Sequence, residues 1–383
     1  MSEVEAADYQ PFEAFPVPAA PEAVLTVTRD EMMVNAASLL AFSKGDMSVN
    51  AVLIAASSGL SLVVESSGLK ARIRMTTSTI RVTEPVRVSV GLRHLLRTLG
   101  ALSRGAIKVQ VSQCSIHLSD GAAEFRLSGS KAKNIQLPGY PPRLSVQADL
   151  IAPLIRWASN AARNADESRK GRVFLVGSGG TLEILGTDGH RLHFASVKTP
   201  VSESFCLALD GAMASLLADA CRGREGLIHF GGGDRWMTIE VGNSYLCVEC
   251  DSEAPFDFHP EIEKAPAWST PLQLSELRSI ARSAVVSGAA ALTIYPDHGR
   301  LRFSSEAVLG YRRYISSDWL PDGAEVTFNA RYVLEALACL PRTGFVTYSH
   351  PADSSLPLTI SAEEIVGGRN VNFTAAIMPV APV

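Results

Sequence analysis

The stretch VSVGLRHLLRTLGAL, residues 88–102, begins as a short apolar strand pattern and then changes to a helical pattern. Two other stretches have the same form: LALDGAMASLLADAC at residues 207–221 and VTFNARYVLEALACL at residues 326–340. Each copy begins 119 residues after the one before it. The apolar face is marked at helical spacing by Leu92, Leu95, Leu96, Leu99 and Leu102 in the first copy and by Val333, Leu334, Leu337 and Leu340 in the third. A regular spacing of this kind indicates an internal repeat.

Two weaker signals keep nearly the same period. A glycine followed by alternating apolar residues, typical of a half-buried strand, occurs at Gly59, Gly180 and Gly299. A glycine followed by strand pattern also comes after each helix, at Gly105, Gly226 and Gly344. Because the period is far longer than the roughly 20–50 residues of solenoid repeats, we expect whole domains of one α+β fold with antiparallel sheets.

The domain boundaries are predicted in two proline-rich stretches, LPGYPPRL at 137–144 and PEIEKAPAWSTP at 260–271. They give a mobile N-terminal extension at residues 1–22 and three domains at 23–140, 141–259 and 260–383. Each of the three domains is expected to contain, in order, a helix, strands, a second helix and further strands.

The composition excludes several classes of protein. The net charge is −4 over 383 residues, which argues against a protein whose whole surface coats nucleic acid. No apolar run is long enough for a membrane span, and the acidic start does not resemble a signal peptide. The only close cysteine pair, Cys247 and Cys250, lies in an apparent strand where residues three apart point to opposite faces. We therefore expect no metal site, no membrane partner and a cytoplasmic location.

Arginines recur on the polar faces of the predicted helices. Arg93 and Arg97 are four residues apart, as are Arg278 and Arg282. Arg156, Asn160 and Arg163 follow the same spacing, and further arginines lie in or just after other helices: Arg222, Arg224, Arg331 and Arg342. Each pair alone is typical of a solvated helix face. Their recurrence in an acidic chain without a base-reading motif favours sequence-independent contact with phosphates.

The turn GTDGHRLHFA, residues 186–195, places Asp188, His190 and Arg191 between two predicted strands. One interpretation is catalysis, with the histidine as a base and the aspartate orienting it, but no nucleophile motif or phosphate-binding loop accompanies it. The other interpretation is structural: Thr187 and Asp188 form an Asx-type turn, Gly189 supplies a positive φ, and the next two side chains bond nearby carbonyls.

Three separated motifs carry a family resemblance. TDGHRL (187–192), FNARYVLEAL (328–337) and AAIMPV (375–380) resemble signatures of the β subunit of bacterial DNA polymerase III, the sliding clamp. The resemblance implies three clamp domains, each with two helices packed on antiparallel sheets, and a head-to-tail homodimer that forms a six-domain ring. It implies a processivity factor without catalytic residues, cofactor or metal, which encircles double-stranded DNA regardless of sequence. A clamp loader ATPase would open the ring, and DNA polymerase III alpha and other proteins would bind it through short peptides.

The resemblance also implies two sets of site residues. The DNA-facing set comprises Lys44, Arg93, Arg97, Arg156, Arg163, Arg222, Arg278, Arg282 and Arg331. The peptide-binding groove comprises Leu175, Thr187, Gly189, His190, Arg191, Leu192, Pro255, His259, Asn329, Tyr332, Ala376, Met378, Pro379 and Val380. In the groove, His190 and Arg191 are expected to orient the site and bond the peptide backbone.

The chain departs from the family pattern at two places. It ends in Ala381-Pro382-Val383, where a basic residue and a leucine are usual, and Ala376 stands where a larger apolar residue is usual. The loop SKGDMSVNAVL (43–53) lacks the usual arginine and prolines, and Lys44 is the nearest substitute. These departures favour an alternative: a clamp-fold paralogue that serves as a protein-interaction or antibiotic-tolerance factor without a full replicative role.

Overall fold

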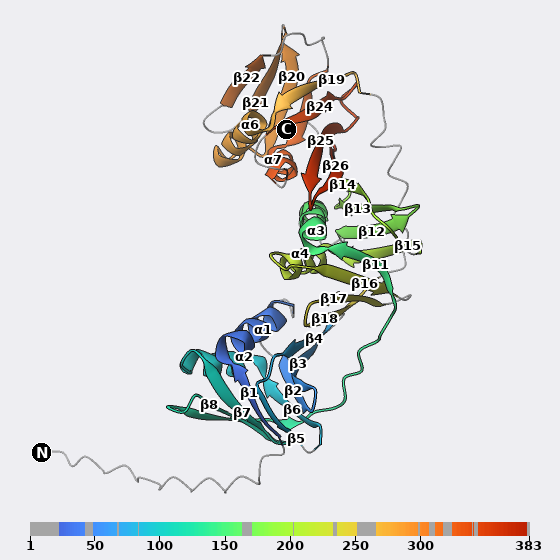
Figure 1. The fold of residues 1–383 in the computed structure, drawn as a ribbon. Coiled ribbons are helices and arrows are strands. Elements are labelled where there is room, and N and C mark those ends of the chain that lie inside the picture. Colours follow the sequence, from blue (N-terminus) through green and yellow to red (C-terminus); the bar gives the residue numbers. More distant parts are fainter. Residues whose placement is uncertain are drawn as a thin grey trace, which may run out of the picture. The chain divides into compact units, whose positions relative to one another are not determined.

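The computed structural model describes residues 23–42, 49–66, 69–82, 84–162, 171–201, 203–232, 236–250, 266–297, 299–305, 311–316, 324–338, 340 and 344–380. These residues form two compact units, which are described separately. Unit 1 takes its residues from 1–36, 50–62 and 74–134, and unit 2 from 37–49, 63–73 and 135–383. The described part is α+β, with six helices and antiparallel strand pairs (Figure 1).

The order of the elements repeats along the chain. The first copy comprises β1 (Ala23–Thr28), α1 (Arg29–Phe42), β2 (Asn50–Ala56), β3 (Gly59–Ser66), β4 (Leu69–Met75), β5 (Thr79–Val82), β6 (Val86–Gly91), α2 (Leu92–Ala101), β7 (Ala106–Val111), β8 (Ser115–Ser119), β9 (Glu124–Ser128) and β10 (Ser130–Lys131). The second comprises β11 (Pro142–Gln147), α3 (Ala148–Ala162), β12 (Arg172–Ser178), β13 (Thr181–Thr187), β14 (Arg191–Lys198), β15 (Phe205–Asp210), α4 (Gly211–Cys221), β16 (Leu227–Gly232), β17 (Trp236–Val241) and β18 (Ser244–Glu249). The third comprises β19 (Trp268–Gln273), α6 (Leu274–Val286), β20 (Ala291–Asp297), β21 (Arg300–Ser305), β22 (Tyr311–Ser316), β23 (Val326–Asn329), α7 (Ala330–Ala338), β24 (Phe345–His350), β25 (Leu358–Val366) and β26 (Arg369–Ile377).

The strand-to-helix junctions predicted in the three copies are confirmed as β6–α2, β15–α4 and β23–α7. The predicted order needs one correction, because every copy begins with a strand rather than a helix. In each copy this first strand is followed without a break by the helix, so the stretch predicted as a helix contains both elements. The two later copies share one order, and the first adds the short strands β5 and β10. The division into three domains at residues 140 and 259 stays a prediction.

Unit 1 contains a five-stranded antiparallel sheet in the order β5-β1-β7-β8-β9 and the pairs β2–β6 and β6–β10. Helix α2 buries Leu92, Leu95 and Leu99, which are the leucines of the predicted apolar face. The Arg29 side chain, at the start of α1, donates through Nε to the carbonyl oxygen of Leu99 at 2.9 Å. That bond adds a second donor to a carbonyl group near the end of α2, which also accepts from the Leu102 N–H at 3.3 Å.

Unit 2 contains an eight-stranded antiparallel sheet in the order β15-β12-β13-β14-β26-β25-β24-β19. Its central pair, β14–β26, joins strands of the second and third copies from Arg191↔Ile377 to Val197↔Val371. Two further groups of strands complete the unit, β4-β18-β17-β16-β11 and β22-β21-β20-β23. Helices α3 and α4 pack against each other, as do α6 and α7 (Figure 1).

Helix α3 lies directly on β13. A Cβ atom built on Gly186 would come 1.8 Å from the carbonyl oxygen of Ala158, so only glycine permits this approach. Trp157 is fully buried beside this contact, with its ring stacked on His193 at 4.4 Å.

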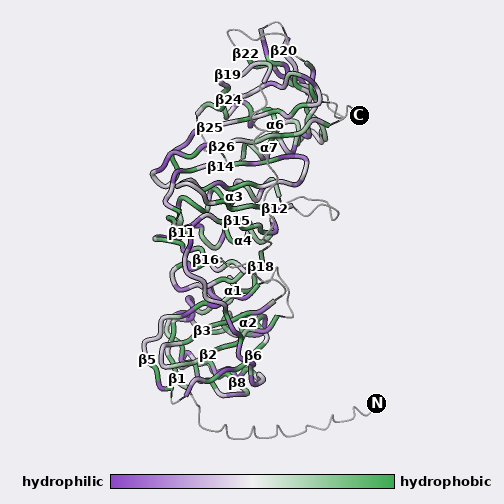
Figure 2. The backbone as a smooth tube through the Cα atoms, turned by 90° about the vertical axis from the view of Figure 1, so that its right-hand side faces the viewer, coloured by the Kyte–Doolittle hydropathy of each residue, from purple (hydrophilic) through white to green (hydrophobic). Residues whose placement is uncertain are grey.

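Hydrophobic residues are spread along the strands and helices of both units (Figure 2). Among the helices of the described ranges, none is long and apolar enough to cross a membrane.

Candidate functional site

The turn between β13 and β14 is held by its own side chains. Asp188 Oδ1 accepts hydrogen bonds from the backbone N–H groups of His190 (3.0 Å) and Arg191 (3.1 Å). Thr187 Oγ1 accepts from the Gly189 N–H at 3.1 Å and donates to the Arg191 carbonyl at 2.8 Å. Gly189 has φ +87°, a conformation that glycine adopts at little cost. The structural interpretation of this turn is therefore confirmed for Thr187, Asp188 and Gly189.

The Arg191 side chain lies beneath the turn rather than on its surface. It is fully buried, and its Nε donates to Asp188 Oδ2 at 3.1 Å and to the Ala161 carbonyl at 3.3 Å. Its Nη1 donates to Glu335 Oε2 on α7 at 2.5 Å. The guanidinium carbon lies 4.2 Å from the centre of the Tyr332 ring, within the range of a cation–π contact. This buried side chain therefore binds protein groups, and its expected role in orienting a groove and bonding a peptide stays a prediction.

The same contacts leave no catalytic pair in the turn. Both carboxylate oxygens of Asp188 are engaged by the turn backbone and by Arg191, so this carboxylate is not available to orient the exposed His190 ring. The neighbouring His193 is buried, and its Nδ1 lies 2.9 Å from the Trp157 carbonyl oxygen. Burial, opposed by that hydrogen bond and reinforced by the charge of Arg191, lowers the pKa of His193 to about 4.

Glu335 was missed by the sequence analysis. Its Oε1 accepts from Arg331 Nε at 2.8 Å, while its other oxygen accepts from Arg191. Burial alone would raise the pKa of this carboxyl group, but the hydrogen bonds and charges of Arg191 and Arg331 lower it below its ordinary value. The i, i+4 spacing of Arg331 and Glu335 was visible in the sequence, whereas the partner 144 residues away was not.

The closing segment, residues 378–380, connects the turn to β23. The Met378 N–H donates to the His190 carbonyl and the Val380 N–H donates to the Thr327 carbonyl, both at 2.9 Å. Pro379 forms an isolated bridge with Phe328. Met378 remains 39% exposed.

The start of α7 completes this side of the site. Asn329 Oδ1 accepts from the backbone N–H groups of Arg331 (3.0 Å) and Tyr332 (3.3 Å), which makes Asn329 a helix cap. The half-buried Tyr332 follows it, and burial raises the pKa of its hydroxyl. Asn329, Tyr332, Met378 and the turn therefore belong to one region of unit 2.

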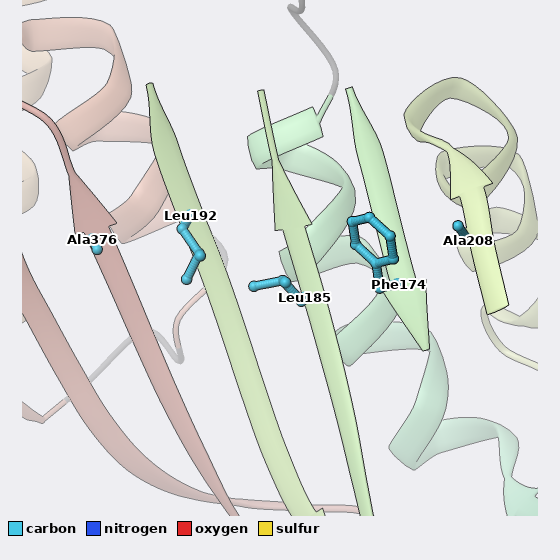
Figure 3. Close-up of a cluster of buried hydrophobic side chains, with 5 residues drawn as sticks. All are labelled: Phe174, Leu185, Leu192, Ala208 and Ala376. Carbon is cyan, nitrogen blue, oxygen red and sulfur yellow. The ribbon is translucent and has the colours of Figure 1, made fainter. Parts of the chain in front are cut away.

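An apolar cluster extends from this region across five strands of the eight-stranded sheet (Figure 3). Its members are Phe174, Leu185, Leu192, Ala208 and Ala376. Leu192 and Ala376 are predicted groove residues and form a direct cross-strand pair.

Leu175 is not on this face of the sheet. It pairs with Ile184, in the row of residues that alternates with Phe174 and Leu185 and faces α3. The structure thus places Phe174, and not Leu175, in the apolar cluster, and the assignment of Leu175 to a peptide groove stays a prediction. The predicted groove residues Pro255 and His259 lie outside the described residues.

The predicted DNA-facing arginines divide into two groups. Arg93, Arg97, Arg222 and Arg282 are exposed. Three others have protein partners. Arg156 donates to Ser215 Oγ at 2.9 Å and pairs with Asp219. Arg278 donates from Nε to the Leu337 carbonyl at 2.8 Å and also to the Leu340 carbonyl. Arg331 pairs with Glu335 and remains 66% exposed. Lys44 and Arg163 lie outside the described residues.

Two open hollows gather several of these arginines. One, of about 340 Å³, lies between α3 and α4 and is lined by Ala152, Pro153, Arg156, Ala218 and Arg222. The other, of about 590 Å³, lies between α6 and α7 and is lined by Ser275, Arg278, Ser279, Arg282, Ser283, Leu334 and Ala338. Both hollows are lined by arginines together with apolar and small side chains, and Arg156 and Arg278 among them are engaged by protein groups.

No cluster of three or more metal-ligating side chains exists in the described part of the chain. Cys247 and Cys250 are buried and not disulfide-bonded, and burial raises the pKa of the Cys247 thiol to about 12.

Known proteins resemble this chain in structure but not detectably in sequence. No family model and no curated protein sequence matches it. The solved DNA polymerase III β subunit of Thermotoga maritima matches with a TM-score of 0.79 at 14% identity. The DNA polymerase sliding clamp of Bacillus subtilis matches with 0.81 at 18% identity, and the DNA polymerase III β subunit of Pseudomonas aeruginosa with 0.81 at 17%. Each match covers 94% of this chain and 100% of the other. The chain therefore has the sliding-clamp fold.

Proposed function

We propose that this chain is a DNA sliding clamp, a non-catalytic processivity factor that encircles duplex DNA and tethers the replicative polymerase and other DNA-processing proteins. The observation that carries the proposal is the match to clamp structures over their whole length. The site supports it as well, since its polar groups are engaged in holding a turn and exposed side chains surround that turn. Such an arrangement suits binding rather than chemistry.

The working form is a head-to-tail homodimer that closes into a ring. A ring of chains needs strand edges that can pair between subunits, because unpaired edges otherwise invite uncontrolled association. The first and last copies both have such edges: in the described ranges β9 pairs only with β8, and β22 only with β21. A two-fold assembly built on them closes and does not grow into fibres. We expect a mass in solution of twice 40.9 kDa.

Contact with DNA is electrostatic and independent of sequence. The exposed helix arginines Arg93, Arg97, Arg222 and Arg282 attract phosphates, and Arg331 adds to them. Loose contacts of this kind hold the ring near the duplex without fixing its register, which permits sliding. An external clamp loader ATPase opens the ring on DNA.

Partner proteins, among them DNA polymerase III alpha, bind through short peptides at the region of His190, Tyr332 and Met378. The apolar cluster that contains Leu192 and Ala376 receives an apolar side chain of the peptide, and exposed Met378 adapts to different sequences. Peptide backbone groups bond to His190 and to main-chain atoms of the turn.

Fluorescence polarisation with a labelled pentapeptide (glutamine, an apolar residue, two further residues, then an aromatic one) tests this proposal. We expect binding that both Met378→Ala and His190→Ala weaken at least fivefold, because both side chains are exposed at the site. Arg97→Ala serves as a control, since that residue is exposed on α2 in unit 1. An absence of binding by a folded, dimeric wild-type protein would contradict the proposal.

One observation favours the second candidate, a clamp-fold paralogue that acts as a protein-interaction or antibiotic-tolerance factor. The charge of Arg156 is offset by Asp219, and Arg278 donates guanidinium N–H groups to the carbonyls of Leu337 and Leu340, so fewer donors are left for phosphates. A dimer that binds partner peptides but does not remain on DNA would support this candidate.

A further inference from the structure

We infer that Glu335 is a positioning residue of the proposed groove, which holds the turn at residues 188–190 and the Tyr332 ring in a fixed relation. The inference rests on the proposed peptide-binding function and deepens it. Glu335 itself faces the interior of the site and need not contact the peptide.

Glu335 joins two arginines in different environments. One oxygen accepts from the fully buried Arg191 at 2.5 Å and the other from the largely exposed Arg331 at 2.8 Å. The carboxylate is 24% exposed, so its pair with Arg191 is only weakly screened by solvent. The inner pair therefore holds more firmly than the outer one.

Arg191, held by Glu335, contacts both the turn and the Tyr332 ring, which lie on two sides of the proposed groove. Its guanidinium group is bonded to Asp188, whose other oxygen fixes the backbone of His190. It also lies 4.2 Å from the centre of the Tyr332 ring. Removal of the Glu335 carboxylate leaves a buried cation with one carboxylate instead of two, and Arg191 is then expected to shift.

The side chains assigned to the groove come from three separate segments of the chain. His190 lies in the turn, Tyr332 in α7 and Met378 in the closing segment, and the Met378 N–H donates to the His190 carbonyl. No single element fixes all three. A hydrogen-bond network that fixes the positions of these three residues before the peptide binds reduces the conformational entropy lost on binding.

The test combines the labelled pentapeptide with amide hydrogen exchange at Met378. We expect Glu335→Ala to weaken peptide binding at least tenfold and to speed exchange of the Met378 N–H. Arg331→Ala, which removes only the outer pair, should stay within twofold of the wild type in both measurements. Glu335→Gln keeps one acceptor oxygen and should fall between them.

Wild-type values for Glu335→Ala in both measurements would overturn the inference, as would equal effects of Glu335→Ala and Arg331→Ala. If Glu335→Ala does not fold, the ordering of Glu335→Gln against Arg331→Ala decides. If the wild-type protein does not bind the peptide, the proposed function fails, and Met378 exchange alone decides this inference.

Discussion

At the scale of single residues, Arg191 is the centre of the candidate site. A fully buried arginine is tolerable only when its charge is compensated, and here Asp188 and Glu335 compensate it from two different elements. Removing one partner of such a pair costs about 3–5 kcal/mol. Arg191 thus stabilises the protein from within, whereas His190 beside it is exposed.

His193 gives the site a dependence on pH. Its pKa falls from the ordinary value of 6.5 to about 4, mainly because it is buried against Trp157. The unfolded chain therefore binds a proton more tightly than the folded one. The contribution of neutral His193 to the free energy of unfolding is fully present above pH 6.5 and is lost as the pH falls toward 4. At about 1.4 kcal/mol per tenfold difference in proton affinity, the loss is about 3 kcal/mol.

We expect His193→Gln to remove this part of the pH dependence. Urea unfolding at pH 7 and pH 4.5, followed by tryptophan fluorescence, measures it, and the stability difference between these values should be smaller in the variant. The dependence will not vanish, because burial also lowers the pKa of His350. Equal losses in variant and wild type would contradict the assignment.

At the scale of elements, the contact between α3 and β13 positions the turn. Gly186 lies one residue before Thr187, and its α-carbon faces the backbone of α3. Gly186→Ala would bring a methyl group within 1.8 Å of the Ala158 carbonyl oxygen, so the helix must move. We expect a loss of about 1–3 kcal/mol and a lower melting temperature. Gly139→Ala is the control, because a Cβ there meets no atom within 4 Å. A similar melting temperature for both variants would show that the helix does not depend on this glycine.

Helix α6 carries one arginine that is bonded to protein groups, Arg278, and one that is exposed, Arg282. Arg278 bonds to the carbonyls of Leu337 and Leu340, so Arg278→Ala should cost about 1–3 kcal/mol by leaving these acceptors without that donor. Arg282 is exposed, and Arg282→Ala should leave the melting temperature unchanged. If Arg282 contacts a phosphate, Arg282→Ala should also lower the steepness of the plot of log binding constant against log salt concentration by about one unit. The reverse pattern, with Arg282→Ala destabilising and Arg278→Ala neutral, would be incompatible with these contacts.

The sequence predicted the strands and helices better than it predicted which groups each side chain contacts. The strands around residues 186–195 and the junctions of all three copies follow from local apolar periodicity, and these predictions are confirmed. The bonds of Arg156 to Ser215, Arg191 to Glu335 and Arg278 to Leu337 cross 59 to 144 residues of chain, and no local pattern contains them. The sequence also left open which face of β12 meets a helix, because strand periodicity predicts that side chains alternate but not which row a helix covers.

At the scale of the whole molecule, the repeated element order and the clamp fold belong together. Three copies of one arrangement give a chain whose first and last copies both carry unpaired strand edges, and a two-fold ring uses such edges without exposing new ones. The acidic net charge with arginines on the helices fits a body that meets DNA on only part of its surface. The proposed function depends on closure of this ring around DNA.

The most direct test of that closure is retention on DNA with blocked ends. The protein is allowed to thread onto a linear duplex anchored to a bead, the free end is capped, and the bead is washed with high salt. We predict that the protein stays through the wash and is released when the duplex is cut, since a closed ring is held by topology rather than charge. Loss of the protein in the wash would mean that charge alone holds it, and would contradict the proposal that this chain encircles DNA.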